Sequence, residues 1–154
     1  MKKCYLLLLV AATFGACQKN NDNSTARANL LTARNWRMSA DTYTTVDNGT
    51  ATTSDEYAKL PACKRDDFLK FNADKSLTTD EGATRCGASL PQTLTGEWDF
   101  NSDQTTLTSH SVAYSSFILL ADIVELSATT LRLRTVTSVY PAATRTEDIT
   151  YTAF

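Results

Sequence analysis

The chain has 154 residues, which is enough for one domain of ordinary size. Its charge is almost balanced, with 15 Lys and Arg against 17 Asp and Glu, and no run of like charge occurs. This composition excludes a general nucleic-acid-binding protein, which would carry a basic stripe.

Residues 1–16 have the pattern of an export signal. Lys2 and Lys3 form a basic start, an apolar run covers residues 5–14, and small residues follow it. The run has about half of the ~20 residues that a membrane-spanning helix needs. We therefore expect a signal peptide that is removed on export, rather than a buried helix of a cytosolic domain.

Cys17 stands where this apolar segment ends. The sequence FGAC, residues 14–17, resembles the lipobox of bacterial lipoproteins, in which the chain is cut just before the Cys. The resemblance implies that the Cys17 sulfur carries a diacylglyceryl group, with acyl chains such as palmitate, and anchors the protein in a membrane. Gln18 follows, where an aspartate can signal inner-membrane retention. We therefore expect the outer membrane of a Gram-negative envelope, with the domain on its periplasmic or its outer surface.

The segment after Cys17 is polar. Residues 18–29, QKNNDNSTARAN, include no large apolar side chain and cannot bury apolar surface. We therefore expect residues 17–29 to be a lipidated Cys with a flexible tether, and residues 30–154 to form the folded domain.

Two thiols remain once the signal segment and Cys17 are set aside, namely Cys63 and Cys86. An exported protein reaches a compartment that permits disulfides, and a bridge here would contribute about 3 kcal/mol in the loop-entropy model. A metal site or a redox pair is the alternative. The chain has a single His, His110, and no CxxC motif, so zinc would find few ligands.

From residue 30 onward the chain has the pattern of β-strands. Thr is abundant, apolar and polar residues alternate, and no long helical period occurs. The expected strands are residues 35–46, 67–73, 76–80, 95–101, 104–110, 116–126, 130–139 and 144–154.

The alternation also predicts which side chains share a face of a strand. In the first strand, Trp36 and Met38 are expected on the face opposite Asp41. In the fourth, Trp98 is expected on the inner face and Glu97 on the outer face.

One connection is longer than the others. Asn48-Gly49 is a strong turn signal. Residues 54–60 are expected to form a short helix, with Ser54 as its N-cap and Pro61 as its stop. This helix would act either as a lid over one mouth of a barrel or as a surface loop pinned by Cys63.

About eight antiparallel strands in a meander, with one apolar face, are expected to close into a small up-and-down barrel. Closure removes the exposed strand edges through which chains aggregate. The expected fold class is therefore all-β, with a β-sandwich of the same strands as the alternative.

The mature chain resembles the lipocalin-like domain of small exported lipoproteins. The resemblance rests on Trp36, on CKRDDFLKFNADKS at residues 63–76, on Cys86, on Gly96-Glu97-Trp98 and on IVELSATTLRLR at residues 123–134. It implies a β-barrel that binds or carries a small apolar ligand.

The sequence contains no catalytic pattern that we recognise. Neither a Gly-x-Ser-x-Gly nor a His-Glu-x-x-His motif occurs, and His110 is expected on the surface. The adjacent carboxylates Asp66-Asp67 and Asp80-Glu81 are expected in turns rather than in a calcium site. No enzymatic activity, cofactor or metal is therefore expected.

The candidate ligand-binding residues are Trp36, Phe71, Trp98 and Leu133. They either line a cavity or fill the barrel, since eight strands enclose room for packed side chains or for one small ligand. The first case predicts a membrane-anchored, monomeric module for a small apolar ligand, with a cavity of ~300 Å³ or more. The second predicts a structural lipoprotein with a solid core, which contacts a protein or a glycan.

Overall fold

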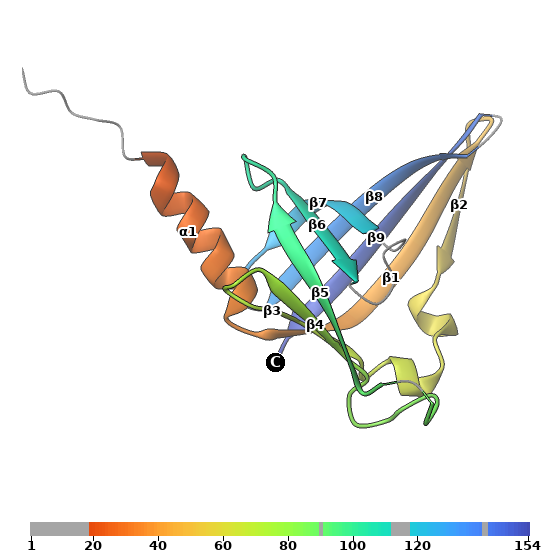
Figure 1. The fold of residues 1–154 in the computed structure, drawn as a ribbon. Coiled ribbons are helices and arrows are strands. Elements are labelled where there is room, and N and C mark those ends of the chain that lie inside the picture. The colour runs from red at the N-terminus through yellow and green to blue at the C-terminus, as the bar shows by residue number, and fades with distance from the viewer. Residues whose placement is uncertain (1–18, 90, 112–117, 140–141) are drawn as a thin grey trace, which may run out of the picture.

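The computed structural model describes residues 19–89, 91–111, 118–139 and 142–154. The strands form one antiparallel sheet, and pairing between β1 (Asn35–Asp47) and β9 (Ala143–Ala153) closes it into a barrel (Figure 1). The all-β barrel expected from the sequence is confirmed, and the sheet does not form a sandwich. No helix among the described residues has the length and apolar character needed to cross a bilayer.

The barrel is eight-stranded, although the sheet contains nine strands, because two of the strands share one edge of β1. β2 (Thr50–Asp55) and β3 (Phe68–Phe71) pair in succession with one edge of β1, and β9 pairs with the opposite edge. The other strands follow around the wall in chain order: β4 (Ser76–Asp80), β5 (Thr93–Phe100), β6 (Thr106–Ser111), β7 (Ile118–Leu126) and β8 (Thr130–Val139).

All the strands expected from the sequence are present, and β2 is an additional strand that was not predicted. Its sequence, TATTSD, has no large apolar side chain, and every residue except Ser54 is exposed. Without a buried face, β2 lacks the alternation by which strands are recognised in a sequence.

The segment before the barrel is helical, which corrects the expectation of a tether from residue 19 onward. The last two turns of α1 (Lys19–Thr32) are rich in Ala, Arg and Leu, which are good helix formers, and its Leu31 is fully buried in the barrel core. The indole Nε1 of Trp36 donates a hydrogen bond of 2.7 Å to the Leu31 carbonyl, one of the groups left unpaired at a helix C-terminus. Cys17 and the signal segment lie outside the described residues.

Two short 3₁₀ helices, η1 (Tyr57–Lys59) and η2 (Ala62–Lys64), occupy the connection between β2 and β3. The short helix predicted here is therefore present only as the single turn η1. Ser54 is not its N-cap, because it lies within β2. The carboxylate of Asp55 instead accepts a hydrogen bond of 2.9 Å from the Ala58 amide.

The predicted disulfide between Cys63 and Cys86 is present, with the two Cα atoms 5.2 Å apart. It joins η2 to the loop between β4 and β5. The carboxylate of Asp66 reinforces this junction, because it accepts hydrogen bonds of 2.8 Å from the backbone amides of both Ala83 and Thr84. The Asp66 side chain therefore holds the β4–β5 loop in place by hydrogen bonds to its backbone.

The apolar core lies at the end of the barrel where α1 meets it. It contains side chains from the helix and from all parts of the wall, packed at exposures below one tenth. The buried apolar residues are Leu31, Trp36, Phe71, Leu77, Trp98, Leu107, Ala121, Leu131, Leu133, Ile149 and Tyr151.

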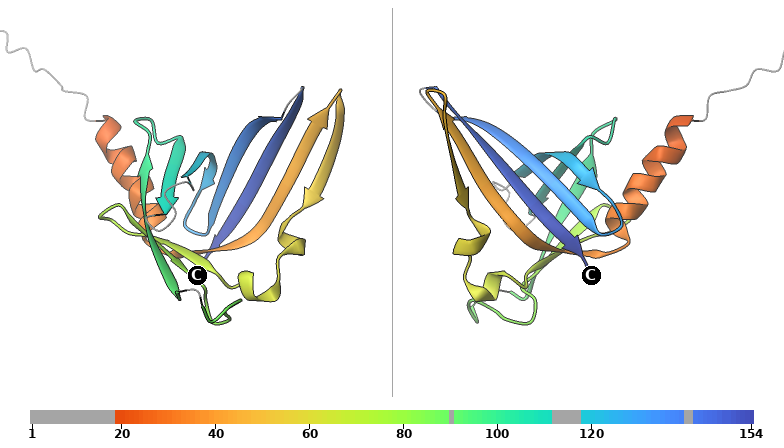
Figure 2. Two further views of the ribbon diagram at one scale, coloured as in Figure 1. Left: turned by 45° about the vertical axis from the view of Figure 1, so that its right-hand side comes forward. Right: turned by 180° about the vertical axis from the view of Figure 1, so that it is seen from behind.

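Four strands continue past the rest of the wall at the opposite end. β2, β1, β9 and β8 stay paired there, and Figure 2 shows them leaning away from β6 and β7. The β1–β2 turn lies at Asn48-Gly49 as predicted, with both residues at positive φ. We call residues 42–47, 50–55, 135–139 and 143–148 the sheet extension.

Candidate functional site

The barrel has a closed end and an open end. The closed end is formed by the C-terminus of α1 and the β3–β4, β5–β6 and β7–β8 turns, and it holds the core. The open end carries the sheet extension and the disulfide-linked loops. A polar hollow lies at the open end, and a second, largely apolar hollow of about 440 Å³ lies at the closed end, between α1 and the β7–β8 turn.

The four candidate ligand residues predicted from the sequence are core residues. Trp36, Phe71, Trp98 and Leu133 are all almost completely buried. The rings of Phe71 and Trp98 meet edge to face at 5.7 Å, and the Trp98 indole donates a hydrogen bond of 3.0 Å to the Asn72 carbonyl. In this arrangement the four side chains are packed in the core at the closed end.

The inner face of the sheet changes from apolar to polar toward the open end. Along β9, alternation places Tyr151 and Ile149 in the core and then Glu147 and Arg145 on the same face of the sheet extension. Tyr43 of β1 lies directly opposite Glu147 in the register. The polar residues of this face thus continue the inside wall of the barrel.

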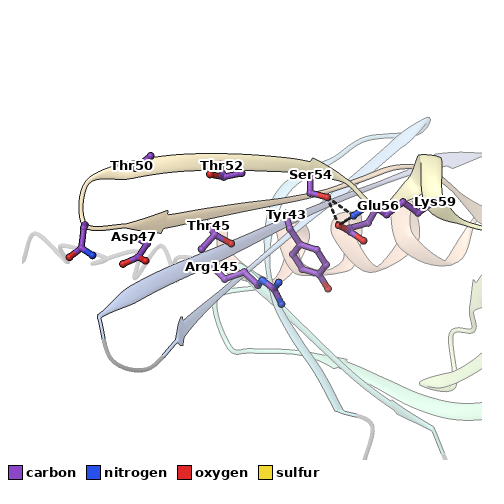
Figure 3. A pocket seen from close by; sticks show the side chains of 10 residues that line it. Tyr43, Thr45, Asp47, Thr50, Thr52, Ser54, Glu56, Lys59 and Arg145 are labelled. Atoms are coloured by element: carbon purple, nitrogen blue, oxygen red, sulfur yellow. Dashed lines mark hydrogen bonds and ion pairs between the residues drawn. The ribbon is translucent and has the colours of Figure 1, made fainter.

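A hollow of about 680 Å³ lies on this polar inner face (Figure 3). Its walls are the sheet extension and the start of the connection that contains η1. Every lining side chain carries a hydroxyl, an amide or a charged group. The lining residues are Tyr43, Thr45, Asp47, Asn48, Thr50, Thr52, Ser54, Glu56, Lys59 and Arg145.

Arg145 and Tyr43 lie side by side in the lining of the hollow. The guanidinium carbon of Arg145 lies 4.5 Å from the centre of the Tyr43 ring, which is a cation–π contact. Burial, a hydrogen bond to Glu147 and the charge of Glu147 raise the pKa of Tyr43 to about 12, so the phenol stays neutral. Among the described residues, Arg145 has no carboxylate within ion-pair distance.

The other cation of the hollow is already paired. Lys59 Nζ lies 2.7 Å from Glu56 Oε1 and 2.6 Å from the Ser54 hydroxyl, and that hydroxyl donates to Glu56 at 2.6 Å. The hydrogen bonds from Lys59 and Ser54 lower the pKa of Glu56. Arg145 is therefore the cation of the hollow that remains available to an anionic group.

Asp41 lies deeper on the same inner face, between Tyr43 and the core, which corrects the expected alternation of β1. A β-bulge between Met38 and Ala40 inserts one residue, so the face of every later residue is reversed. Burial, followed by the charges of Glu147, Glu56 and Asp55, raises the pKa of Asp41 to about 6. Its Oδ1 atom is buried without a hydrogen-bond partner.

The remaining candidate groups lie outside the hollow. His110 is on the outer face of the barrel, 43% exposed, with Nε2 3.5 Å from Glu97 Oε2. Lys64 Nζ lies 2.5 Å from Glu81 and 3.1 Å from Asp67, so these acidic pairs are part of the loop structure. Within the described ranges, no three acidic, His or Cys side chains converge as metal ligands would.

Tyr43, Arg145, Glu147 and Asp41 were not singled out from the sequence as site residues. The TRTEDITY run of β9 held a usable signal, because Arg145 and Glu147 alternate in phase with Ile149 and Tyr151. Such a pattern indicates an inner face that becomes polar along one strand.

An antiparallel barrel closed by its first and last strands, with one plugged and one open end, is the lipocalin-like architecture. Residues 32–133 match the family described as a lipocalin-like domain. The chain therefore belongs to the lipocalin-like domain family. No curated protein matches the chain significantly.

Proposed function

We propose that this protein is a membrane-anchored binding protein that holds a small amphipathic molecule at the open end of its barrel. The observation that carries the proposal is the 680 Å³ hollow around Tyr43 and Arg145. A carboxylate, sulfonate or phosphate of the ligand pairs with Arg145, since charge-assisted hydrogen bonds to guanidinium are strong and directional. The apolar part lies against the Tyr43 ring and the methyl groups of Thr45 and Thr52.

This ligand differs from the small apolar molecule expected from the sequence. The rings of Phe71 and Trp98, which would have held an apolar molecule, pack against each other in the core, whereas the polar hollow is open to solvent. The same packing supports the second candidate function, a lipoprotein with a solid core that binds a protein or a glycan and has no small ligand.

A binding experiment separates the two functions. Anilinonaphthalene sulfonate, which joins an apolar ring system to an anion, is titrated into the protein and its fluorescence followed. We expect saturable binding that Arg145→Ala weakens at least tenfold. Arg132→Ala is the matched control, because Arg132 lies on the outer face of β8. Binding that both variants retain equally, or no saturable binding, would favour the solid-core lipoprotein.

The anchor is the second part of the proposal. The lipobox at Cys17 supports diacylglyceryl attachment, and Gln18 supports an outer-membrane location in a Gram-negative envelope. The 14 residues of α1 span about 21 Å, enough to hold the barrel away from lipid headgroups.

Detergent partitioning tests the anchor. The protein from its native host is expected in the detergent phase of Triton X-114, and Cys17→Ser is expected to move it to the aqueous phase. A Cys17→Ser protein that still enters the detergent phase would show that this residue does not carry the anchor.

A further inference from the structure

One edge of β8 has no partner strand over part of its length. β8 pairs with β9 from Thr130 to Val139, but its pairing with β7 ends at Asp122 opposite Arg134. Residues 135–139 of β8 therefore present an edge on which no strand is paired among the described residues.

β7 leaves β8 at the same level of the barrel. Residues 118–121 of β7 pair with β6 and not with β8. If the register of the β7–β8 ladder continued, Leu120 would lie opposite Val136. Both side chains point outward and are the most exposed large apolar residues described, at 63% and 61%. The divergence of the strands therefore leaves apolar surface beside an open edge.

Among the residues that the structure describes, the edge also lacks the devices that usually protect open strands. Residues 135–139 have the sequence TVTSV, which contains no charged residue and no Pro. Its first three residues are all β-branched. Lysine, proline, bulges and covering loops are the common means by which natural sheets prevent pairing at an edge. The sequence here instead favours an extended strand with free backbone donors and acceptors.

We propose that residues 135–139 of β8 accept an extended segment of another protein, which adds a strand to the sheet extension. Backbone hydrogen bonds supply the affinity, as in other cases of strand addition, and alternate side chains supply the specificity. The segment that fits is uncharged. Its outward side chains are apolar and contact Val136 and Leu120, and its inward side chains are small and lie beside Thr135 and Thr137.

The size of the edge favours a peptide segment over a second copy of the chain. A stable dimer of folded proteins buries about 800 Å² on each partner. Five residues of one strand edge, with a few exposed apolar side chains, offer much less contact area than this. A single added strand, in contrast, can pair with the whole of the open edge. The proposal concerns a surface other than the polar hollow and does not depend on the binding of a small molecule there.

The test uses the full exported protein in detergent micelles and a fluorescent synthetic peptide of alternating threonine and valine with a lysine at each end. Fluorescence anisotropy gives the affinity, and amide hydrogen exchange followed by mass spectrometry locates the contact. We expect the peptide to slow exchange in residues 135–139. A peptide with proline at alternate positions is expected not to bind, because it lacks the required backbone donors.

Val136→Lys is the test variant, because it places a charge on the outer face at the open edge. Thr144→Lys is its matched control, since Thr144 is exposed on the same face but lies on β9, which is paired on both sides. We expect Val136→Lys to weaken binding at least tenfold and Thr144→Lys to change it less than twofold. Equal effects of the two variants, or no binding to the unchanged protein, would overturn the proposal. So would protection of residues 135–139 without peptide in a protein that sediments as a dimer, because the occupant would then be a second copy.

Discussion

Phe71 and Trp98 meet edge to face at the closed end of the barrel, with ring centres 5.7 Å apart and ring planes at 87°. Trp98 is held from two further directions. Its indole donates to the Asn72 carbonyl at 3.0 Å, and Lys75 Nζ lies 4.1 Å from the ring centre. β3, the β3–β4 turn and β5 are thus joined through one side chain.

Trp98→Ala is therefore expected to lower the free energy of unfolding by about 3–5 kcal/mol, because it opens a cavity and removes these contacts. Glu97→Ala, on the exposed face of the same strand, is expected to cost no more than about 0.5 kcal/mol. Urea unfolding of the exported chain carrying Cys17→Ser measures both. Small and equal losses at the two positions would contradict the register of β5.

Substitution of Leu31 tests whether α1 is part of the folded barrel. Leu31→Ala removes a fully buried side chain and is expected to cost about 2–5 kcal/mol. Asn29→Ala, at an exposed position of the same helix, is expected to cost about 0.5 kcal/mol or less. The same unfolding measurement serves, and a stable Leu31→Ala protein would show that the helix does not pack on the barrel in solution.

The disulfide is expected to restrict the unfolded chain. Replacing Cys63 and Cys86 together by Ser should lower the free energy of unfolding by about 3 kcal/mol, given the sequence separation of 23 residues. Non-reducing peptide mapping of the protein from its native host should give one linked peptide that contains both residues. Two alkylated free thiols in that protein would contradict the bridge.

Asp41 is expected to make stability depend on pH. Its pKa is about 6 in the folded protein, against 3.8 for an unperturbed Asp. A raised pKa means that the folded state holds the proton more tightly. The resulting stabilisation is complete below pH of about 3.8 and is lost as the pH rises through about 6.

Asp41→Asn should therefore stabilise the protein at neutral pH, by about 1 kcal/mol once solvent screening of the half-buried carboxylate is allowed for. The gain should vanish in acid, where Asp41 is protonated. Urea unfolding at about pH 7 and about pH 4 measures the difference. Asp47→Asn, at the exposed end of the same strand, is the control for loss of a carboxylate from β1. A gain that is the same at both pH values would rule out titration of Asp41 as its cause.

Much of this architecture follows from local sequence patterns. Alternation along a strand depends only on neighbouring residues, so it was enough to locate most strands and to place Trp98 inside and Glu97 outside. The turn at Asn48-Gly49 and the pairing of Cys63 with Cys86 likewise needed only residue types and the expected compartment.

The tertiary structure alone decided the features that depend on distant partners. The bulge after Met38, in the pairing of β1 with β9, turns Asp41 inward, although the local alternation of β1 predicts the opposite. β2 forms because β1 offers it an edge, and α1 is fixed in place because the barrel core receives Leu31. The contact between Tyr43 and Arg145 exists only because the first and last strands close the barrel, which brings together residues from opposite ends of the folded domain.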